Sequence, residues 1–219
     1  MKITPTAIPD ILLLEPTVHG DHRGFFMETF RQSLFDEQVP GIRFVQDNHS
    51  KSAQGILRGL HYQLQRPQGK LIRVVAGEIY DVAVDMRDGS PTFGKSVGAL
   101  LSAHNHHQLW VPPGFAHGFY VVSDSAEMVY KCSDYYAPGD EYSLLWNDPA
   151  LKIDWPLIAG APQPVLSDKD RDGLLLRDAP VFSAPSAGLK KEPSAGLTKE
   201  PSAGLAKEPS AGLEKEPST

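Results

Sequence analysis

Turn signals recur at short intervals through most of this chain, and they limit how long any helix or strand between them can be. Clusters of Gly, Pro, Asp and Ser lie at residues 88–91, 112–114 and 138–140. Short apolar or alternating runs lie between them, at residues 70–75, 81–85, 108–111 and 126–132. Many short strands joined by frequent turns are typical of a sandwich or barrel. The sequence therefore predicts an all-β jelly-roll barrel with few short helices, of which residues 28–38 are the clearest.

The end of the chain has a different, repetitive composition. An eight-residue repeat, Pro-Ser-Ala-Gly-Leu-Lys-Lys-Glu at residues 185–192, recurs with small changes up to residue 216. Each copy carries one large apolar residue and is interrupted by Pro and Gly, so it offers too little apolar surface to offset the entropy lost on ordering. We therefore expect one folded domain at residues 1–183 and a disordered tail at residues 184–219 that activity does not require.

Charge and composition exclude several classes of protein. The chain has 21 Lys and Arg against 27 Asp and Glu, an acidic balance that argues against general nucleic-acid binding. It has no stretch near the roughly 20 apolar residues that a membrane span needs, and its start lacks the apolar core of a secretory signal. A lone cysteine, Cys132, rules out an intrachain disulfide framework. We expect a reducing, cytoplasmic setting.

The segment with the densest chemistry is Leu57-Arg58-Gly59-Leu60-His61. A regular strand would place Arg58 and His61 on opposite faces, because three positions separate them. They can face one cavity only if the strand is interrupted, and Gly59 is where an interruption is least costly. On spacing alone, a surface arginine beside a core histidine is the simpler interpretation.

Other polar residues fall within predicted strands. Lys70 begins an apolar run from which it could point into the barrel, and His117 follows a rigid Pro-Pro-Gly turn. Tyr130 alternates with Met128 and Cys132, which predicts that it points inward. Taken singly, each of these residues is more simply structural; together they would put a base, an acid and a cation in one barrel.

Metal binding is a further hypothesis, since His104 and His106 form a His-x-His pair. No third ligand follows at a suitable spacing, and the segment resembles a turn, so we expect no metal there. The signatures of a P-loop, a dinucleotide site and a nucleophile elbow are also missing from the sequence.

Several motifs together carry a resemblance to a known family. They stand at residues 21–28 (DHRGFFME), 46–50 (QDNHS), 57–63 (LRGLHYQ), 112–119 (PPGFAHGF), 129–132 (VYKC), 134–136 (DYY) and 166–170 (LSDKD). In this order, over residues 3–178, they resemble the dTDP-4-dehydrorhamnose 3,5-epimerases, a metal-free branch of the cupin-type jelly rolls. The repeat tail has no counterpart in the family pattern.

The resemblance implies an isomerase of dTDP-rhamnose biosynthesis that inverts C3 and C5 of dTDP-4-dehydro-6-deoxy-glucose without a cofactor. Both carbons flank the C4 ketone, so each proton can leave through an enolate. The resemblance makes His61 the base and Asp170 the carboxylate that orients it. Lys70 would stabilise the enolate oxygen, and Tyr130 would return the proton on the opposite face.

The same resemblance assigns the contacts to the dTDP-sugar, with Tyr136 stacking on the thymine. The remaining contacts fall on Arg23, Phe26, Glu28, Gln46, Asn48, Arg58, His117, Glu141 and Lys169. It also implies a homodimer in which the N-terminal segment carrying Arg23, Phe26 and Glu28 completes the neighbour's site.

Three alternatives stay open. An epimerase that inverts only C3 or only C5 of a related dTDP-4-keto sugar would use the same residues. A sugar-nucleotide-binding cupin without turnover would lack a working base, whereas His61 is present. A metal-dependent cupin oxygenase would lose activity in excess chelator.

Overall fold

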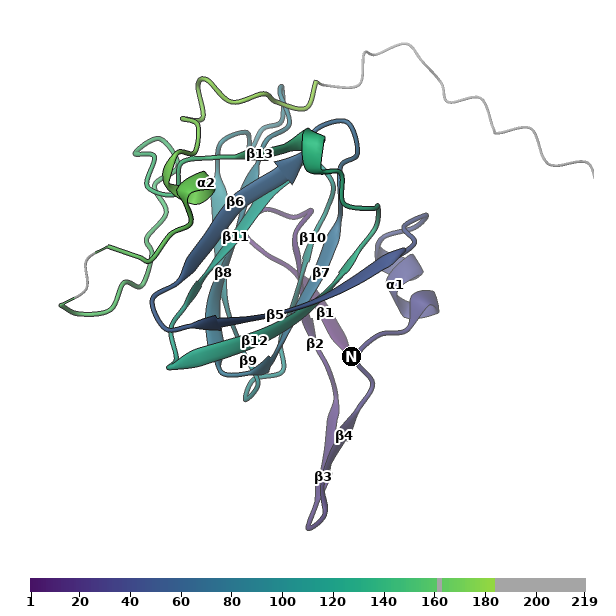
Figure 1. The fold of residues 1–219 in the computed structure, drawn as a ribbon. Helices are drawn as coiled ribbons and strands as arrows, with labels where there is room; N and C mark the ends of the chain where they lie inside the picture. The colour runs from purple at the N-terminus through teal and green to yellow at the C-terminus, as the bar shows by residue number, and fades with distance from the viewer. Residues whose placement is uncertain (161–162, 184–219) are drawn as a thin grey trace, which may run out of the picture. The chain divides into compact units, whose positions relative to one another are not determined.

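Two antiparallel β-sheets face each other in the computed structural model, which describes residues 1–160 and 163–183 (Figure 1). The six-stranded sheet has the order β1 (Lys2–Pro5), β2 (Leu12–Glu15), β10 (Gln108–Val111), β7 (Lys70–Ala76), β12 (Ser125–Cys132) and β5 (Gln46–Ala53). The five-stranded sheet has the order β13 (Glu141–Ser143), β6 (Leu57–Gln63), β11 (Phe115–Val121), β8 (Glu78–Asp85) and β9 (Ser96–Ser102). The expected all-β jelly roll is confirmed.

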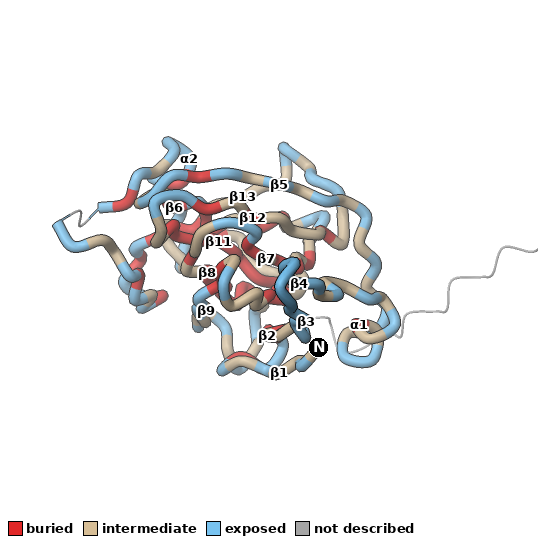
Figure 2. Tube along the Cα trace, turned by 90° about the horizontal axis from the view of Figure 1, so that it is seen from below, coloured by how far each residue is buried: buried red, intermediate tan, exposed pale blue. Residues whose placement is uncertain are grey.

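The main core lies between the two sheets. Met128 and Ile72 from the six-stranded sheet pack in one cluster with Ile79 and Phe119 from the five-stranded sheet. Figure 2 accordingly shows buried residues gathered on the central strands, such as β7, β8 and β11. Tyr130 packs against this cluster, which confirms its predicted inward orientation.

The outer faces of both sheets are partly covered. Helix α1 (Gln32–Gln38) packs Phe35 against Trp110 and Leu71 on the outside of the six-stranded sheet. The outside of the five-stranded sheet forms a cluster with residues that follow β13, including Trp146 and Trp155.

Helix α1 is shorter than the predicted helix at residues 28–38. Its N-cap, Arg31, is extended, with φ −142° and ψ 122°. Two tertiary contacts keep the preceding residues out of the helix: Gln108 Nε2 donates to the Thr29 carbonyl at 2.8 Å, and the Phe30 ring packs on Phe44. Such contacts outweigh local helix propensity.

Two short helices were not among the predicted elements: the 3₁₀ helix η1 (Pro138–Asp140) and the helix α2 (Asp168–Arg171). Residues 103–105, which include His104, form a turn as expected. Strands β3 (Val18–Asp21) and β4 (Gly24–Met27) pair only with each other and project from the barrel as a hairpin (Figure 1). The predicted tail at residues 184–219 lies outside the described residues.

Candidate active site

His61 on β6 is hydrogen-bonded to Asp170 on α2, with 2.5 Å between His61 Nε2 and Asp170 Oδ1. The Asp170 carboxylate also accepts from Ser167 Oγ at 2.7 Å and from the Gly59 backbone N–H at 3.3 Å. Burial raises the pKa of Asp170, but these hydrogen bonds outweigh burial and hold that pKa below its usual value. The ionised Asp170 carboxylate therefore accepts a hydrogen bond from His61 Nε2, and His61 Nδ1 is the ring nitrogen that can accept a proton.

The start of α2 fixes where Asp170 points. Ser167 is the N-cap residue, and its Oγ accepts from the Asp170 backbone N–H at 3.2 Å. The Ser167 hydroxyl donates in return to the Asp170 carboxylate, so one side chain both caps the helix and holds the carboxylate. Because Ser167 also fixes the position of the Asp170 carboxylate, the four-residue helix α2 is long enough to orient His61.

Gly59 brings Arg58 and His61 to the same face of β6. Leu57 and Leu60 are three residues apart, yet both pack in the cluster outside the five-stranded sheet. Gly59 has φ 122°, and the pairing of β6 with β11 shifts register between His117 and Phe119. Arg58 and His61 consequently share the opposite, interior face, as the predicted interruption at Gly59 requires.

Glu141 lies on the other side of the His61 ring. Its Oε1 is 3.9 Å from His61 Nδ1, and its Oε2 accepts from Lys169 Nζ at 2.6 Å and from the Tyr136 hydroxyl at 3.0 Å. Burial raises the pKa of Glu141, but the Lys169 hydrogen bond and the nearby His61 outweigh it and lower that pKa. Glu141 thus lies between His61 on one side and Tyr136 and Lys169 on the other.

Lys70 and Tyr130 approach from the six-stranded sheet. Lys70 lines a small cavity together with His61 and Glu141. Burial lowers the pKa of the Lys70 ammonium, although the neighbouring Cys132 and acidic groups oppose that shift. Burial also raises the pKa of the Tyr130 hydroxyl. Burial thus shifts the pKa of each group toward its uncharged form.

His117 on β11 lies directly opposite His61 in the sheet register. Its Nε2 is 2.9 Å from both carboxylate oxygens of Asp81, a fully buried residue of β8. The sequence interpretation did not single out Asp81, because its alternation with apolar residues is equally typical of a strand with a solvated face. Only the pairing of β8 with β11 reveals that the acidic side of this strand faces inward.

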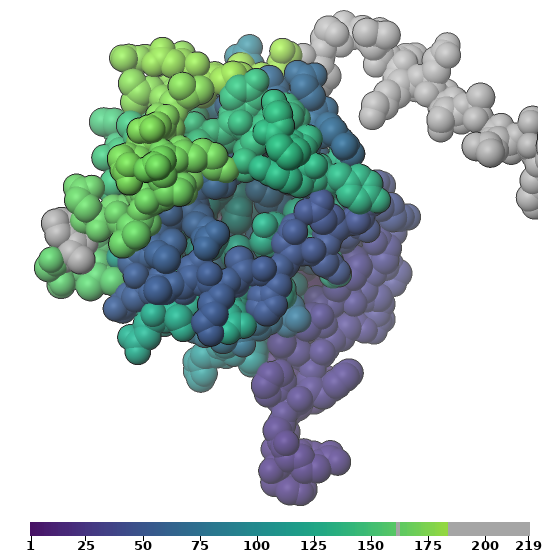
Figure 3. Space-filling model, viewed as in Figure 1, coloured from purple at the N-terminus to yellow at the C-terminus, as the bar shows by residue number. Residues whose placement is uncertain are grey.

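The remaining polar residues come from β5 and β6. Gln46 Nε2 donates to Asn48 Oδ1 at 3.1 Å, and the Tyr136 backbone N–H donates to Gln46 Oε1 at 3.0 Å. Arg58 Nε donates to Ser52 Oγ at 3.0 Å. The space-filling view shows a hollow in the face of the barrel where β5 and β6 lie (Figure 3). The side chains from β5 and β6 are thus amide and guanidinium groups, and Gln46 joins them to the backbone of Tyr136.

Comparison with known proteins identifies the family. The family model described as dTDP-4-dehydrorhamnose 3,5-epimerase matches residues 5–178. The chain belongs to the dTDP-4-dehydrorhamnose 3,5-epimerase family.

Individual relatives in this epimerase family align with most of this chain. A dTDP-4-dehydrorhamnose 3,5-epimerase from Pseudomonas aeruginosa is 56% identical and aligns over 83% of this chain and 99% of its own. One from Neisseria gonorrhoeae is 61% identical over 79% of this chain, which spans about half (52%) of that longer protein. The crystal structure of a dTDP-6-deoxy-D-glucose-3,5-epimerase from Legionella pneumophila, in complex with dTDP-4-keto-L-rhamnose, has a TM-score of 0.76 and 53% identity, and covers 80% of this chain and 93% of its own.

In this member of the epimerase family, three of the expected substrate contacts stay apart from His61. Arg23 is paired with Asp21 in the β3–β4 hairpin at 2.6 Å, and Glu28 is paired with Arg31 at 2.7 Å. Phe26 is 72% exposed. None of the three lines the cavity that holds His61 and Lys70, so a single described chain does not bring the full expected set together.

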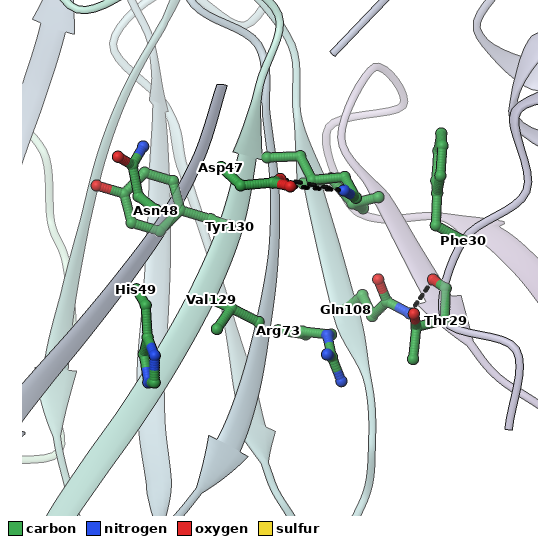
Figure 4. A pocket seen from close by; sticks show the side chains of 11 residues that line it. Thr29, Phe30, Asp47, Asn48, His49, Arg73, Gln108, Val129 and Tyr130 are labelled. Carbon is green, nitrogen blue, oxygen red and sulfur yellow. Dashed lines mark hydrogen bonds and ion pairs between the residues drawn. The ribbon is translucent and has the colours of Figure 1, made fainter. Parts of the chain in front are cut away.

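A second pocket, of about 330 Å³, lies on the outer face of the six-stranded sheet. Figure 4 shows the side chains that line it, with the Asp47–Lys131 ion pair and the hydrogen bond from Gln108 to Thr29. Asn48 and Tyr130 lie side by side at its border. In this epimerase-family fold the outer pocket is separate from the His61–Asp170 pair.

Within residues 1–160 and 163–183, no three His, Cys, Asp or Glu side chains come together as a group that could hold a metal ion. In that same part of the chain, no helix is long and apolar enough to cross a membrane.

Proposed function

We propose that this protein is a dTDP-4-dehydrorhamnose 3,5-epimerase, an isomerase that inverts C3 and C5 of dTDP-4-dehydro-6-deoxy-glucose in dTDP-rhamnose biosynthesis. The observation that carries the proposal is the His61–Asp170 pair in a chain of this family, whose histidine lines a cavity together with Lys70. The reaction moves protons only, so it requires no redox cofactor.

His61 is the base in this proposal. Asp170 accepts a hydrogen bond from Nε2, and this fixes the tautomer in which Nδ1 carries the free lone pair. Nδ1 removes the proton from C3 or C5, and the resulting imidazolium lies between Asp170 and Glu141. Two carboxylates beside the ring stabilise the charge that forms during the step.

Lys70 stabilises the enolate. Removal of either proton places negative charge on the C4 oxygen, and a cation in a dry site stabilises that charge more in the transition state than in the ground state. Because burial lowers the pKa of Lys70, the ammonium can also share its proton with the developing oxyanion. We place Lys70 at the C4 oxygen for these reasons.

Tyr130 delivers the proton that completes inversion. It belongs to β12 of the six-stranded sheet, whereas His61 belongs to β6 of the five-stranded sheet. Groups that approach from two facing sheets can act on opposite faces of a sugar ring held between them. Because burial raises the pKa of Tyr130, the phenol is protonated near neutral pH and can serve as the acid.

The nucleotide half of the substrate falls to the rim of the site. Arginine bonds a diphosphate through two parallel N–H groups, which suits Arg58 and Arg23. Tyr136 is half exposed and can stack on the thymine, with Lys169, Glu141, Gln46 and Asn48 as further polar contacts. The buried His117 contacts the substrate deeper in the site.

A homodimer is part of the proposal. The β3–β4 hairpin exposes Phe25 and Phe26, 61% and 72% respectively, and large exposed aromatic side chains mark interaction sites. We place Arg23 and Phe26 of each hairpin, together with Glu28 directly after it, in the neighbour's site. A cytoplasmic location also remains a proposal; it rests on the single cysteine of the sequence.

Mixing two inactive variants tests the exchange of hairpins. Arg23→Ala and His61→Ala homodimers should both have low activity, but a mixed dimer should contain one intact site, with His61 from one chain and Arg23 from the other. Partial recovery of activity after denaturing and refolding the two variants together supports the exchanged hairpin. No recovery, with mixed dimers shown by mass spectrometry, contradicts it.

Solvent deuterium tests the reaction itself. In D₂O, the proposed enzyme should incorporate deuterium at both C3 and C5 of the dTDP-4-keto sugar. Label at one carbon only would identify a single epimerase, and binding without exchange would identify a non-catalytic cupin. Loss of activity in excess chelator would favour a metal-dependent enzyme instead.

A further inference from the structure

Ser143 on β13 lies beside the proposed base. It is the register partner of His61 on β6, and side chains of directly opposed residues lie on the same face of a sheet. The intervening pair, Tyr142 and Tyr62, stacks on the other face, with 5.6 Å between ring centroids. Both tyrosines belong to the cluster outside the five-stranded sheet. Ser143 therefore points toward the interior, as His61 and Glu141 do.

The Ser143 hydroxyl is exceptional among the described residues. Within residues 1–160 and 163–183, its Oγ is the only buried side-chain nitrogen or oxygen that has no hydrogen-bond partner in the protein. Other buried serines are paired: Ser52 Oγ accepts from Arg58, and Ser102 Oγ accepts from the Asn105 backbone N–H at 2.9 Å. Buried polar groups are nearly always paired, and an exception beside reacting groups points to a partner that arrives with a ligand.

We propose that Ser143 Oγ positions the sugar by hydrogen bonding to one of its oxygen atoms next to His61. This inference rests on the proposed function, which supplies a sugar with hydroxyl and ketone oxygens on the carbons beside those that lose protons. A hydroxyl both donates and accepts, so it can pair with either kind of oxygen. Holding that oxygen keeps the reacting C–H bond aligned with His61 Nδ1, and alignment of this kind governs the rate of proton transfer.

In this proposal, different residues contact the sugar and the nucleotide of the substrate. Tyr136 and Lys169, the proposed nucleotide contacts, reach the site through Glu141, whereas Ser143 stands opposite the base. Removing the Ser143 hydroxyl should therefore weaken the interactions of the sugar and leave dTDP binding unchanged. It should not lower stability, since no hydrogen bond within the described protein is lost.

The test compares Ser143→Ala with Ser102→Ala, which removes a paired serine hydroxyl far along the chain. For Ser143→Ala, we expect kcat/KM for dTDP-4-dehydro-6-deoxy-glucose to fall about tenfold, with dTDP affinity and melting temperature unchanged. For Ser102→Ala, we expect a lower melting temperature and unchanged kcat/KM. A kcat/KM of Ser143→Ala within twofold of wild type overturns the proposal. A parallel loss of melting temperature and dTDP affinity would also overturn it, because that pattern belongs to a structural role.

Measurements on the wild-type protein distinguish a failure of the Ser143 proposal from a failure of the proposed function. If wild type does not exchange deuterium at C3 or C5, the proposed function fails. The Ser143 proposal is then decided by calorimetry with dTDP-glucose and dTDP. A preference of wild type for dTDP-glucose that Ser143→Ala loses supports the contact, and a preference that the variant retains refutes it.

Discussion

Gly59 of β6 and Gly118 of β11 approach so closely that a Cβ added to Gly59 would lie 2.5 Å from the Gly118 Cα. A Cβ added to Gly118 would in turn lie 2.7 Å from the Arg58 carbonyl oxygen. Neither glycine therefore has room for a side chain toward the other strand. This approach lies between Arg58 and His61 on one strand and beside His117 on the other, so the glycine pair determines where the proposed base and its neighbours stand.

Replacing Gly59 with alanine should destabilise the fold and reduce activity. The residue has φ 122° and meets backbone atoms that cannot rotate away, so we expect a loss of at least about 2 kcal/mol in the free energy of unfolding. Urea denaturation measures this loss. Gly139→Ala is the matched control, because a Cβ there meets nothing within 4 Å. Equal stability of the two variants would contradict the close approach.

Replacing His61 with alanine should abolish turnover by removing the base. We expect kcat to fall by about 10²–10⁴-fold, while dTDP affinity measured by calorimetry stays unchanged. His104→Ala removes an exposed histidine from a turn and should have wild-type kinetics. Near-normal turnover of His61→Ala would exclude His61 as the base.

Replacing Tyr130 with phenylalanine should separate two steps of the reaction. The variant keeps the base but lacks the acid, so epimerised product should fall more than deuterium exchange does. Mass spectrometry and NMR of the sugar in D₂O report both quantities. Tyr80→Phe, on the outer face of the five-stranded sheet, should change neither. If Tyr130→Phe reduces epimerised product and deuterium exchange equally, the assignment of His61 as base and Tyr130 as acid is wrong.

The Asp85 carboxylate should make the free energy of unfolding depend on pH in the acidic range. Burial raises the pKa of this fully buried residue, but hydrogen bonds from Arg87, Ser90 and Thr92 outweigh it and lower the pKa from 3.8 to about 2. The folded state therefore favours the ionised form, which contributes about 2 kcal/mol at pH 7. This contribution is present above about pH 4 and is lost as the pH falls toward 2.

Asp85→Asn tests that dependence. The wild type should exceed the variant in free energy of unfolding at pH 7, and the difference should shrink between pH 4 and pH 2. Urea denaturation across this range measures it. A difference that stays constant down to pH 2.5 would show that the Asp85 carboxylate is not preferentially ionised in the folded protein.

Deleting residues 185–219 should leave kinetics unchanged. All of the proposed site residues lie before this segment, and the repeat has too little apolar surface to form a core of its own. Steady-state kinetics of the truncated and full-length chains provide the comparison. A large loss of activity on truncation would refute the prediction that the tail is inessential.

Local pattern was enough to predict much of this protein. Alternation along residues 126–132 predicted that Tyr130 points inward with Met128, and the turn signals predicted many short strands. The three-residue spacing of Arg58 and His61 showed only that both could face one cavity if Gly59 interrupted its strand, and the family resemblance made that interruption a prediction. Each of these features depends on neighbours within a few positions, where backbone geometry alone decides which face a side chain occupies.

Only the tertiary structure decided which of these residues meet. His61 and Asp170 are 109 residues apart in the chain, and Asp81 and His117 are 36 apart. Alternation in residues 81–85 could not reveal which side of β8 faces inward, and nothing in the sequence marked Ser143 as the neighbour of His61. Such pairs depend on strand order and register, which arise from packing the whole barrel. The sequence therefore determined the strands and the residue types, whereas the fold determined the site that they form.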